Sequence, residues 1–242
     1  MSTKEQLQTN RRGFLGSIAT GAAALGIGTL AAPLQSYAEH NPKIYDDADP
    51  DEWISRVKGK KHRVVFDAVE PNEVMPFVWP KVFLLTNAAT GTAEKDCGVI
   101  VVLRHSAIPY AFEDKLWEKY NFAEFFPKSG ELGGAYQAAD AATAAKTRNP
   151  MWKPKKGDFK VPGFGEVPIG INELQESGVM FCVCNAAMTV YSAIAAMKMN
   201  TDAAAVKKEW EAGLLPGIQV VPSGVWAVGR AQENGCSYVY AG

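Results

Sequence analysis

A cysteine at position 184 is the first candidate for chemistry in this chain of 242 residues. It ends the apolar run Val179–Cys184 and is followed at once by Asn185 and two alanines, a pattern typical of a β-strand that leads directly into a helix. A helix N-terminus stabilises negative charge, so a thiol at that point can react as a thiolate. We therefore predict that Cys184 is a reactive thiol and that Asn185 lines the same site.

Cys182 lies two residues earlier in the same run and receives the opposite interpretation. Side chains alternate across a strand, so both thiols are expected on one face, with Cys182 deeper in the element. Cysteine is among the most often buried residue types, which makes Cys182 a predicted structural residue. A structural role stays open for Cys184 as well.

Other polar residues follow the predicted strands, and ligands of an open parallel sheet bind beyond the carboxyl ends of its strands. His105 can take or give a proton near neutral pH, and we predict that it assists the thiol of Cys184. A histidine satisfied by a backbone carbonyl is the alternative. Arg104 and His105 point to opposite faces of an extended chain, so at most one of them is expected beside the thiol. The predicted binding residues, besides Asn185, are Arg104, Ser106, Ser223 and Gly224.

The elements that must position these residues alternate along the chain. Short apolar runs rich in β-branched or aromatic residues predict strands at Arg63–Ala68, Gly98–Leu103, Val179–Cys184, Ile218–Val221 and Ser237–Tyr240. Helical periodicity or composition predicts helices at Phe77–Ala89, Phe112–Phe122, Ile171–Glu176, Ala186–Met199, Asp202–Leu214 and Val225–Glu233. Nearly continuous apolar strands alternating with helices predict a mainly parallel five-stranded sheet covered on both faces, a three-layer α/β/α fold of flavodoxin-like architecture.

Helix boundaries are marked by a few residues. Pro80 suits the first turn of a helix, and Asp202 is placed to cap the helix that follows it. Gly178, Gly217 and Gly235 follow helical stretches, where a left-handed residue commonly ends the helix.

The N-terminal residues 1–38 have the features of an export signal. Arg11 and Arg12 precede Phe14 and Leu15, as in twin-arginine signals, and an apolar stretch rich in glycine and alanine leads to a small-residue cleavage site at Ser36–Ala38. We expect residues 1–38 to be removed, residues 39–61 to form a polar lead-in and residues 62–242 to form one α/β domain. The expected location is periplasmic or extracytoplasmic, reached in the folded state through the twin-arginine translocase.

Composition excludes several classes of partner. The net charge is −1, and no basic surplus points to nucleic acid. No glycine-rich phosphate loop follows a predicted strand, so no cofactor is predicted. The spacing Cys-x-Cys differs from the paired Cys-x2-Cys of structural zinc sites, so no metal is predicted either. An oxidising compartment would permit disulfides, and the sequence does not choose among the three pairings of four cysteines.

Residues 127–168 are too long for an ordinary connection between two core elements. We expect this insert to be a lid, an arm toward another subunit or a mobile segment. Its lysines could attract an anion or simply be solvated. They are Lys153, Lys155, Lys156 and Lys160.

Three segments, at 98–106, 174–185 and 219–238, resemble the DsrE/DsrF-like (YchN-like) sulfur-relay proteins. The resemblance implies a three-layer α/β/α domain that assembles as a homo-oligomer, a trimer or hexamer. It also implies a persulfide on the cysteine after the third strand, where Cys184 stands, and a sulfur donor or acceptor protein as partner. Departures from the family are Asn185 where many members have glycine, the insert, and the export signal in a mostly cytoplasmic family. The leading expectation is an exported sulfur carrier, and the alternative is an oligomeric ligand-binding or assembly module without covalent chemistry.

Overall fold

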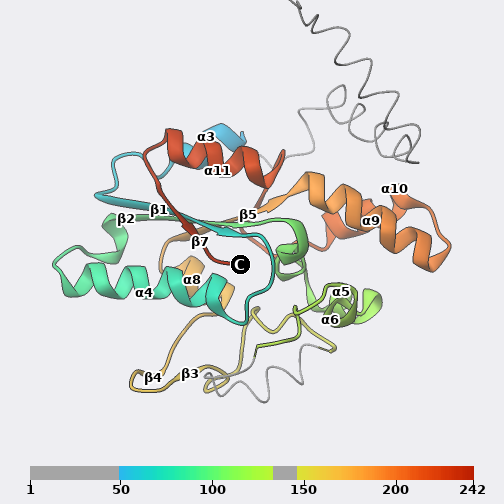
Figure 1. The fold of residues 1–242 in the computed structure, drawn as a ribbon, viewed down its shortest axis with the longest axis horizontal. Helices are drawn as coiled ribbons and strands as arrows, with labels where there is room; N and C mark the ends of the chain where they lie inside the picture. Colours follow the sequence, from blue (N-terminus) through green and yellow to red (C-terminus); the bar gives the residue numbers. More distant parts are fainter. Residues whose placement is uncertain (1–48, 133–145) are drawn as a thin grey trace, which may run out of the picture. The chain divides into compact units, whose positions relative to one another are not determined.

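A five-stranded parallel sheet lies between two layers of helices in the computed structural model, which describes residues 49–132 and 146–242 (Figure 1). The strand order is β6-β5-β2-β1-β7, and every neighbouring pair is parallel. The strands are β1 (His62–Ala68), β2 (Cys97–Leu103), β5 (Val179–Cys184), β6 (Ile218–Val221) and β7 (Ser237–Tyr240). The predicted fold class and all five predicted strands are confirmed.

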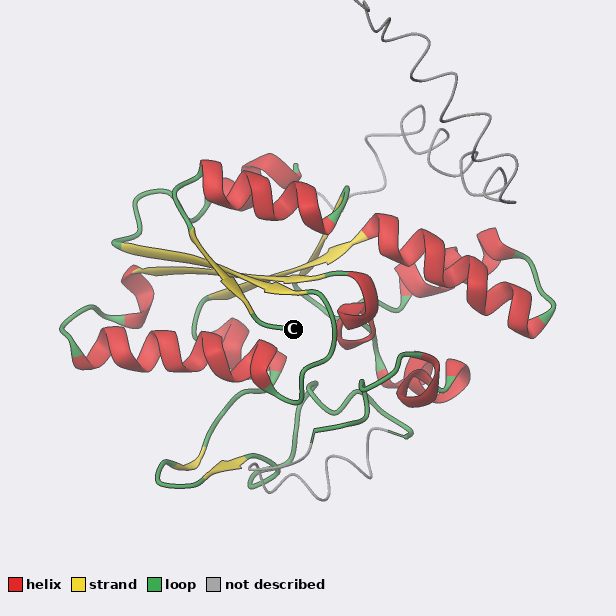
Figure 2. Cartoon of the chain, viewed as in Figure 1, coloured by secondary structure: helices red, strands yellow, loops and turns green. Residues whose placement is uncertain are grey.

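The helices lie before β1 and in every connection between the strands of the sheet. They are α3 (Pro50–Ser55), α4 (Met75–Ala89), α5 (Asp114–Tyr120), α6 (Phe122–Phe125), α8 (Ile171–Glu176), α9 (Asn185–Met199), α10 (Ala203–Ala212) and α11 (Gly224–Glu233). Two 3₁₀ helices, η1 (Glu94–Asp96) and η2 (His105–Ala111), flank β2. A small antiparallel hairpin of β3 (Lys160–Val161) and β4 (Gly165–Glu166) stands apart from the main sheet (Figure 2).

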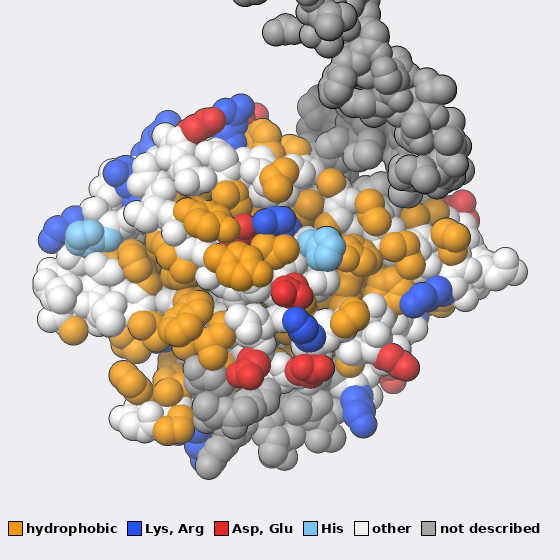
Figure 3. Space-filling view, in the orientation of Figure 1, with side chains coloured by type: hydrophobic (Ala, Val, Ile, Leu, Met, Phe, Trp, Pro, Cys, Tyr) orange, Lys and Arg blue, Asp and Glu red, His pale blue; other side chains and the backbone are white. Residues whose placement is uncertain are grey.

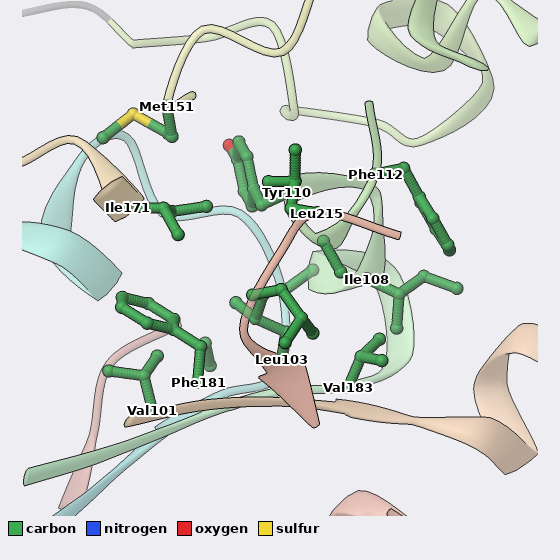
Figure 4. Packing of buried hydrophobic residues seen from close by; sticks show 14 of the residues in the cluster. Val101, Leu103, Ile108, Tyr110, Phe112, Met151, Ile171, Phe181, Val183 and Leu215 are labelled. Atoms are coloured by element: carbon green, nitrogen blue, oxygen red, sulfur yellow. The ribbon is translucent and has the colours of Figure 1, made fainter. Parts of the chain in front are cut away.

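Alternation along the strands divides the core into two hydrophobic clusters, one on each face of the sheet. The larger cluster joins the strands to α4, α9 and η2, and Figure 4 shows Leu103, Phe181 and Val183 pointing from the sheet into it. The smaller cluster joins the opposite face to α3 and α11, and Val102 and Ala227 belong to it. Burial on both faces explains why the strands read as continuous apolar runs in the sequence.

Helix ends follow the predicted signals. The Asp202 carboxylate accepts a hydrogen bond from the Ala205 N–H at 2.8 Å and caps α10. Gly178, Gly217 and Gly235 have φ values of +87°, +76° and +84°, a region that glycine enters without a steric penalty. The predictions for Asp202, Gly178 and Gly235 are confirmed, whereas Gly217 lies in a turn beyond the end of α10, whose C-cap is Gly213.

Two helix predictions need correction. Pro80 lies inside α4 rather than in its first turn, because the helix begins at Met75 and Pro76 occupies the first turn. The predicted helix at Phe112–Phe122 is two helices, since Asn121 adopts a left-handed conformation with φ +48° between α5 and α6. Phe112 itself follows η2 in an extended conformation.

The polar lead-in contributes to the core from residue 50 onward. Its acidic cluster begins α3, where the Asp49 side chain accepts a hydrogen bond from the Asp51 N–H at 2.7 Å. Trp53 and Ile54 of α3 are buried in the smaller cluster. The expected signal at residues 1–38 and the first part of the lead-in lie outside the described residues.

The described part of the insert is packed on the domain, which was not expected of a lid, an arm or a mobile segment. The buried Asn149 side chain donates to the carbonyl oxygens of Tyr110 and Phe112 and accepts from the Met151 N–H. Met151 and Phe159 are buried in the larger cluster. Residues 133–145 of the insert lie outside the described residues.

Candidate functional site

A pocket of about 360 Å³ lies at the carboxyl ends of β2, β5 and β6. Helix α9 follows β5 and packs into the larger cluster, whereas α11 follows the neighbouring β6 and packs into the smaller one. When the chain leaves two neighbouring strands toward opposite faces of the sheet, a crevice remains between the ends of those strands. The pocket is lined by Arg104, His105, Cys184, Ala186, Ala187, Val190, Tyr191, Ile194, Ser223, Gly224 and Val225.

Cys184 ends β5 and is the N-cap of the 15-residue helix α9. Its sulfur accepts a hydrogen bond from the Ala187 N–H at 3.3 Å. The residue is 6% exposed and lines the pocket. A thiolate here would meet the positive end of the α9 dipole.

Cys182 is fully buried, and it packs into the smaller cluster whereas Cys184 belongs to the larger one. Cys184 is still part of β5 and pairs with Val221, a residue of the smaller cluster, so the common face of the two thiols stays a prediction. Burial raises the pKa of Cys182 well above its usual value, and the nearby Cys184 adds to the rise. Cys182 is thus held as a neutral thiol.

Arg104 is fixed beside the thiol by a buried carboxylate. Its Nε and Nη2 donate hydrogen bonds to Oδ1 and Oδ2 of Asp67 at 2.6 and 2.9 Å, and the Tyr238 hydroxyl donates to Oδ2 at 2.9 Å. The hydrogen bonds with Asp67 raise the pKa of Arg104 against the effect of burial, and the charge of a Cys184 thiolate raises it further. Arg104 thus brings a positive charge to the pocket that Cys184 also lines.

His105 enters the same pocket as Arg104, so the expectation that at most one of them would face the thiol is wrong. The strand ends at Leu103, and His105 adopts a left-handed conformation with φ +48° that redirects its side chain. Its Nε2 lies 3.3 Å from the Tyr191 hydroxyl, and the two rings meet edge to face. The hydrogen-bond partner of His105 is thus Tyr191, and its assistance to Cys184 stays a prediction.

Ser223 and Gly224 lie where the sequence places them, at the N-terminus of α11. The Ser223 hydroxyl accepts a hydrogen bond from the Trp226 N–H at 3.2 Å. Gly224 leaves room for the side chain of Arg104, since a β-carbon on Gly224 would fall 2.5 Å from Cβ and from Cδ of Arg104. The glycine is therefore part of the support for the arginine.

Asn185 and Ser106 do not line the pocket. Asn185 is buried, and its side-chain oxygen has no hydrogen-bond partner among the described residues. Ser106 is buried in η2, and its N–H donates to the Val69 carbonyl at 3.1 Å. Five of the predicted site residues do line the pocket together, and Asn185 and Ser106 lie outside it. The five are Cys184, His105, Arg104, Ser223 and Gly224.

Three contributors were not predicted as site residues: Asp67, Tyr191 and Tyr238. Asp67 stands near the end of a predicted strand, which was a usable signal. Tyr191 follows Cys184 by seven residues, two helical turns, and so lies on the same side of α9. Tyr238 reaches Asp67 only because β7 pairs with β1, a contact between distant segments.

The four cysteines all lie in described residues, and all are free and buried. Burial also raises the pKa values of Cys97 and Cys236. Among residues 49–132 and 146–242, no group of three or more His, Cys, Asp or Glu side chains is arranged to hold a metal ion. No helix in this part of the chain has the length and apolar character needed to cross a bilayer.

Comparison with known proteins identifies neither a family nor a function for this chain. No family model matches the chain, and no curated protein matches it. Two chains of solved structures match, and one of them is MTH1491, a protein of unknown function from Methanobacterium thermoautotrophicum. The two sequences are 17% identical, the match covers 74% of this chain and 99% of that chain, and the TM-score is 0.38.

Proposed function

We propose that this chain is an exported DsrE-like carrier of sulfane sulfur that holds a persulfide on Cys184. The observation that carries the proposal is the position of this thiol. Cys184 caps α9, accepts a hydrogen bond from the Ala187 N–H and lines the same pocket as the guanidinium of Arg104. A thiolate and a persulfide anion both gain from such surroundings.

The chemistry requires no cofactor. The Cys184 thiolate attacks the terminal sulfur of an inorganic polysulfide, a new S–S bond forms, and an S–S bond of the donor breaks. The shortened polysulfide leaves with the electron pair of the broken bond. An acceptor thiolate then attacks the outer sulfur of the persulfide, and Cys184 leaves as a thiolate. Sulfur moves in both steps without a net change of oxidation state.

The pocket walls suit a reactive sulfur species. Val190 and Ile194 of α9 and Val225 of α11 give the pocket apolar sides. The thiol of Cys184 is itself only 6% exposed, and burial strengthens the electrostatic interactions around it. Arg104 provides positive charge on the side formed by the end of β2.

Cyanolysis tests this proposal. Protein incubated with inorganic polysulfide and then desalted should release thiocyanate when cyanide is added, at one equivalent per chain. Cys184→Ser should release none, whereas Cys182→Ser, which changes a thiol in the other cluster, should release as much as the parent protein. Equal release from Cys184→Ser and the parent would contradict the proposal.

A binding module without covalent chemistry is the second candidate, and the small exposure of Cys184 favours it. In that case the apolar pocket holds a ligand and the thiol only fills space. Cys184→Ala would then keep its ligand, and the parent protein would release no thiocyanate after exposure to polysulfide.

A further inference from the structure

The edge strand β7 is open along its outer side. It pairs with β1 on its inner side, and no described strand pairs with its outer side. All four of its residues are exposed, with Tyr238, Val239 and Tyr240 at 45%, 37% and 55%. Soluble proteins usually protect an edge strand with charges or proline, and Ser237–Tyr240 contains neither. Hydrophobic side chains gather in the middle of this face, where β7 lies (Figure 3).

The direction of the free backbone groups follows from one hydrogen bond. The Ala241 N–H donates to the Asp67 carbonyl of β1 at 3.0 Å. The N–H and C=O of a strand residue point to the same side, and that side alternates from residue to residue. Val239 therefore also faces β1. The N–H and C=O groups of Tyr238 and Tyr240 point outward.

We propose that the outer edge of β7 binds the same edge of a second copy of this chain, antiparallel, about a two-fold axis at Val239. In this register Tyr238 lies opposite the partner's Tyr240, and Tyr240 lies opposite the partner's Tyr238. Both are hydrogen-bonded pairs, so every outward N–H and C=O of the two tyrosines finds a partner. Val239 lies opposite the partner's Val239 as the non-hydrogen-bonded pair at the axis.

The sequence of the edge favours a second copy over another strand. Tyr238, Val239 and Tyr240 read the same in both directions, so an antiparallel copy presents matching residues. The tyrosines form cross-strand aromatic pairs on one face of the joined sheet, and the valines meet on the other. The other edge strand of the sheet, β6, is buried along its whole length. The β7 edge of one copy therefore cannot pair with the β6 edge of another copy. The contact is thus a closed two-fold interface.

This interface restricts the size of the assembly. A two-fold contact gives an even number of copies. The inference is independent of the proposed sulfur chemistry, since none of the β7 residues lines the pocket.

A proline substitution tests the hydrogen bonds of the edge. Tyr240→Pro removes an outward N–H in each copy and leaves the ladder to β1 intact, because edge strands accept proline where the N–H faces outward. Light scattering coupled to size-exclusion chromatography should find the parent protein in an even-numbered assembly. Tyr240→Pro should raise the dissociation constant of the two-fold contact by at least about tenfold. Tyr240→Phe is the matched control and should behave like the parent protein.

Disulfide cross-linking tests the register. The Cα atoms of a non-hydrogen-bonded pair are about 4.5 Å apart, within the range for a disulfide. In a Cys184→Ala background, Val239→Cys should give a covalent dimer under mild oxidation. Tyr240→Cys should not, because residue 240 lies opposite residue 238. A monomeric parent protein, which would result if another segment of the chain covers β7, overturns the proposal. An assembly in which Val239→Cys does not cross-link would also overturn the proposal. So would an assembly whose dissociation constant is unchanged by Tyr240→Pro.

Discussion

The side chain of Arg104 lies directly against Gly224, so close that a β-carbon on the glycine would fall 2.5 Å from Cβ of the arginine. The N-terminus of α11 thus forms a wall that holds the guanidinium toward Asp67. Gly224, which has no side chain, therefore determines where the positive charge of Arg104 lies in the pocket.

Gly224→Ala should therefore disturb both stability and the site. Overpacking of this kind costs about 1–3 kcal/mol of unfolding free energy, and relief by moving Arg104 would break its pair with Asp67. Gly229→Ala is the control on the same helix, because nothing lies within 4 Å of its added β-carbon. The unfolding free energy of Gly229→Ala, measured in urea, should be about 0.5–1 kcal/mol higher than that of the parent protein, because alanine has the higher helix propensity. Equal behaviour of the two variants would contradict the packing argument.

Asp67→Asn should destabilise the protein by about 2–4 kcal/mol, because it leaves the partly buried guanidinium of Arg104 without its counter-charge. Tyr238→Phe removes only the hydroxyl bond to the same carboxylate and should cost about 1 kcal/mol. Thermal unfolding of both variants measures the difference. Similar values for the two would mean that the charge of Asp67 contributes little.

The four thiols should differ in their reaction with iodoacetamide. Burial raises the pKa values of Cys97, Cys182 and Cys236, so these three thiols stay protonated to higher pH and react slowly. Cys184 opens into the pocket and should be modified at least about tenfold faster in the folded protein. Peptide mapping by mass spectrometry after a short reaction at pH 8 would identify the site. Modification of another cysteine first would contradict the prediction that the pocket makes Cys184 the most reactive thiol.

Asn149→Ala should loosen the insert. It removes hydrogen bonds to the carbonyl oxygens of Tyr110 and Phe112 and to the Met151 N–H, and it leaves buried groups unpaired. The expected loss is about 2–4 kcal/mol of unfolding free energy. Proteolysis within residues 146–168 should become faster than in Asn172→Ala, which removes a single bond to the Lys153 N–H at the surface. Equal rates would show that Asn149 does not anchor the segment.

The sequence predicts the sheet well because β1, β2, β5 and β6 are buried along most of their length and therefore carry their own local signal. It also identifies the thiol, the arginine and the glycine of the pocket, since these stand at strand ends. It wrongly separates His105 from Arg104, because His105 adopts a left-handed conformation after β2 and no local pattern reveals that turn. Tyr238 was missed because its contact with Asp67 depends on the pairing of β7 with β1.

The lead-in and the insert illustrate the same limit. Trp53 lies in a polar, charged segment, and its burial depends on a helix that packs across the sheet. Asn149 lies among prolines and lysines, and only the folded chain brings it to the carbonyl groups of η2 and the residue after it. Local composition predicts which residues of such a segment are solvated. It does not predict which residues hold the segment to the rest of the domain.

The most direct test of the central claim is the intact mass of the protein after exposure to inorganic polysulfide and removal of excess reagent. The account predicts a gain of the mass of one sulfur atom, reversed by dithiothreitol and located on the peptide that contains Cys184. Cys182→Ser should show the same gain and Cys184→Ser none. An unchanged mass in the parent protein, or a sulfur atom on any other cysteine, would contradict the claim.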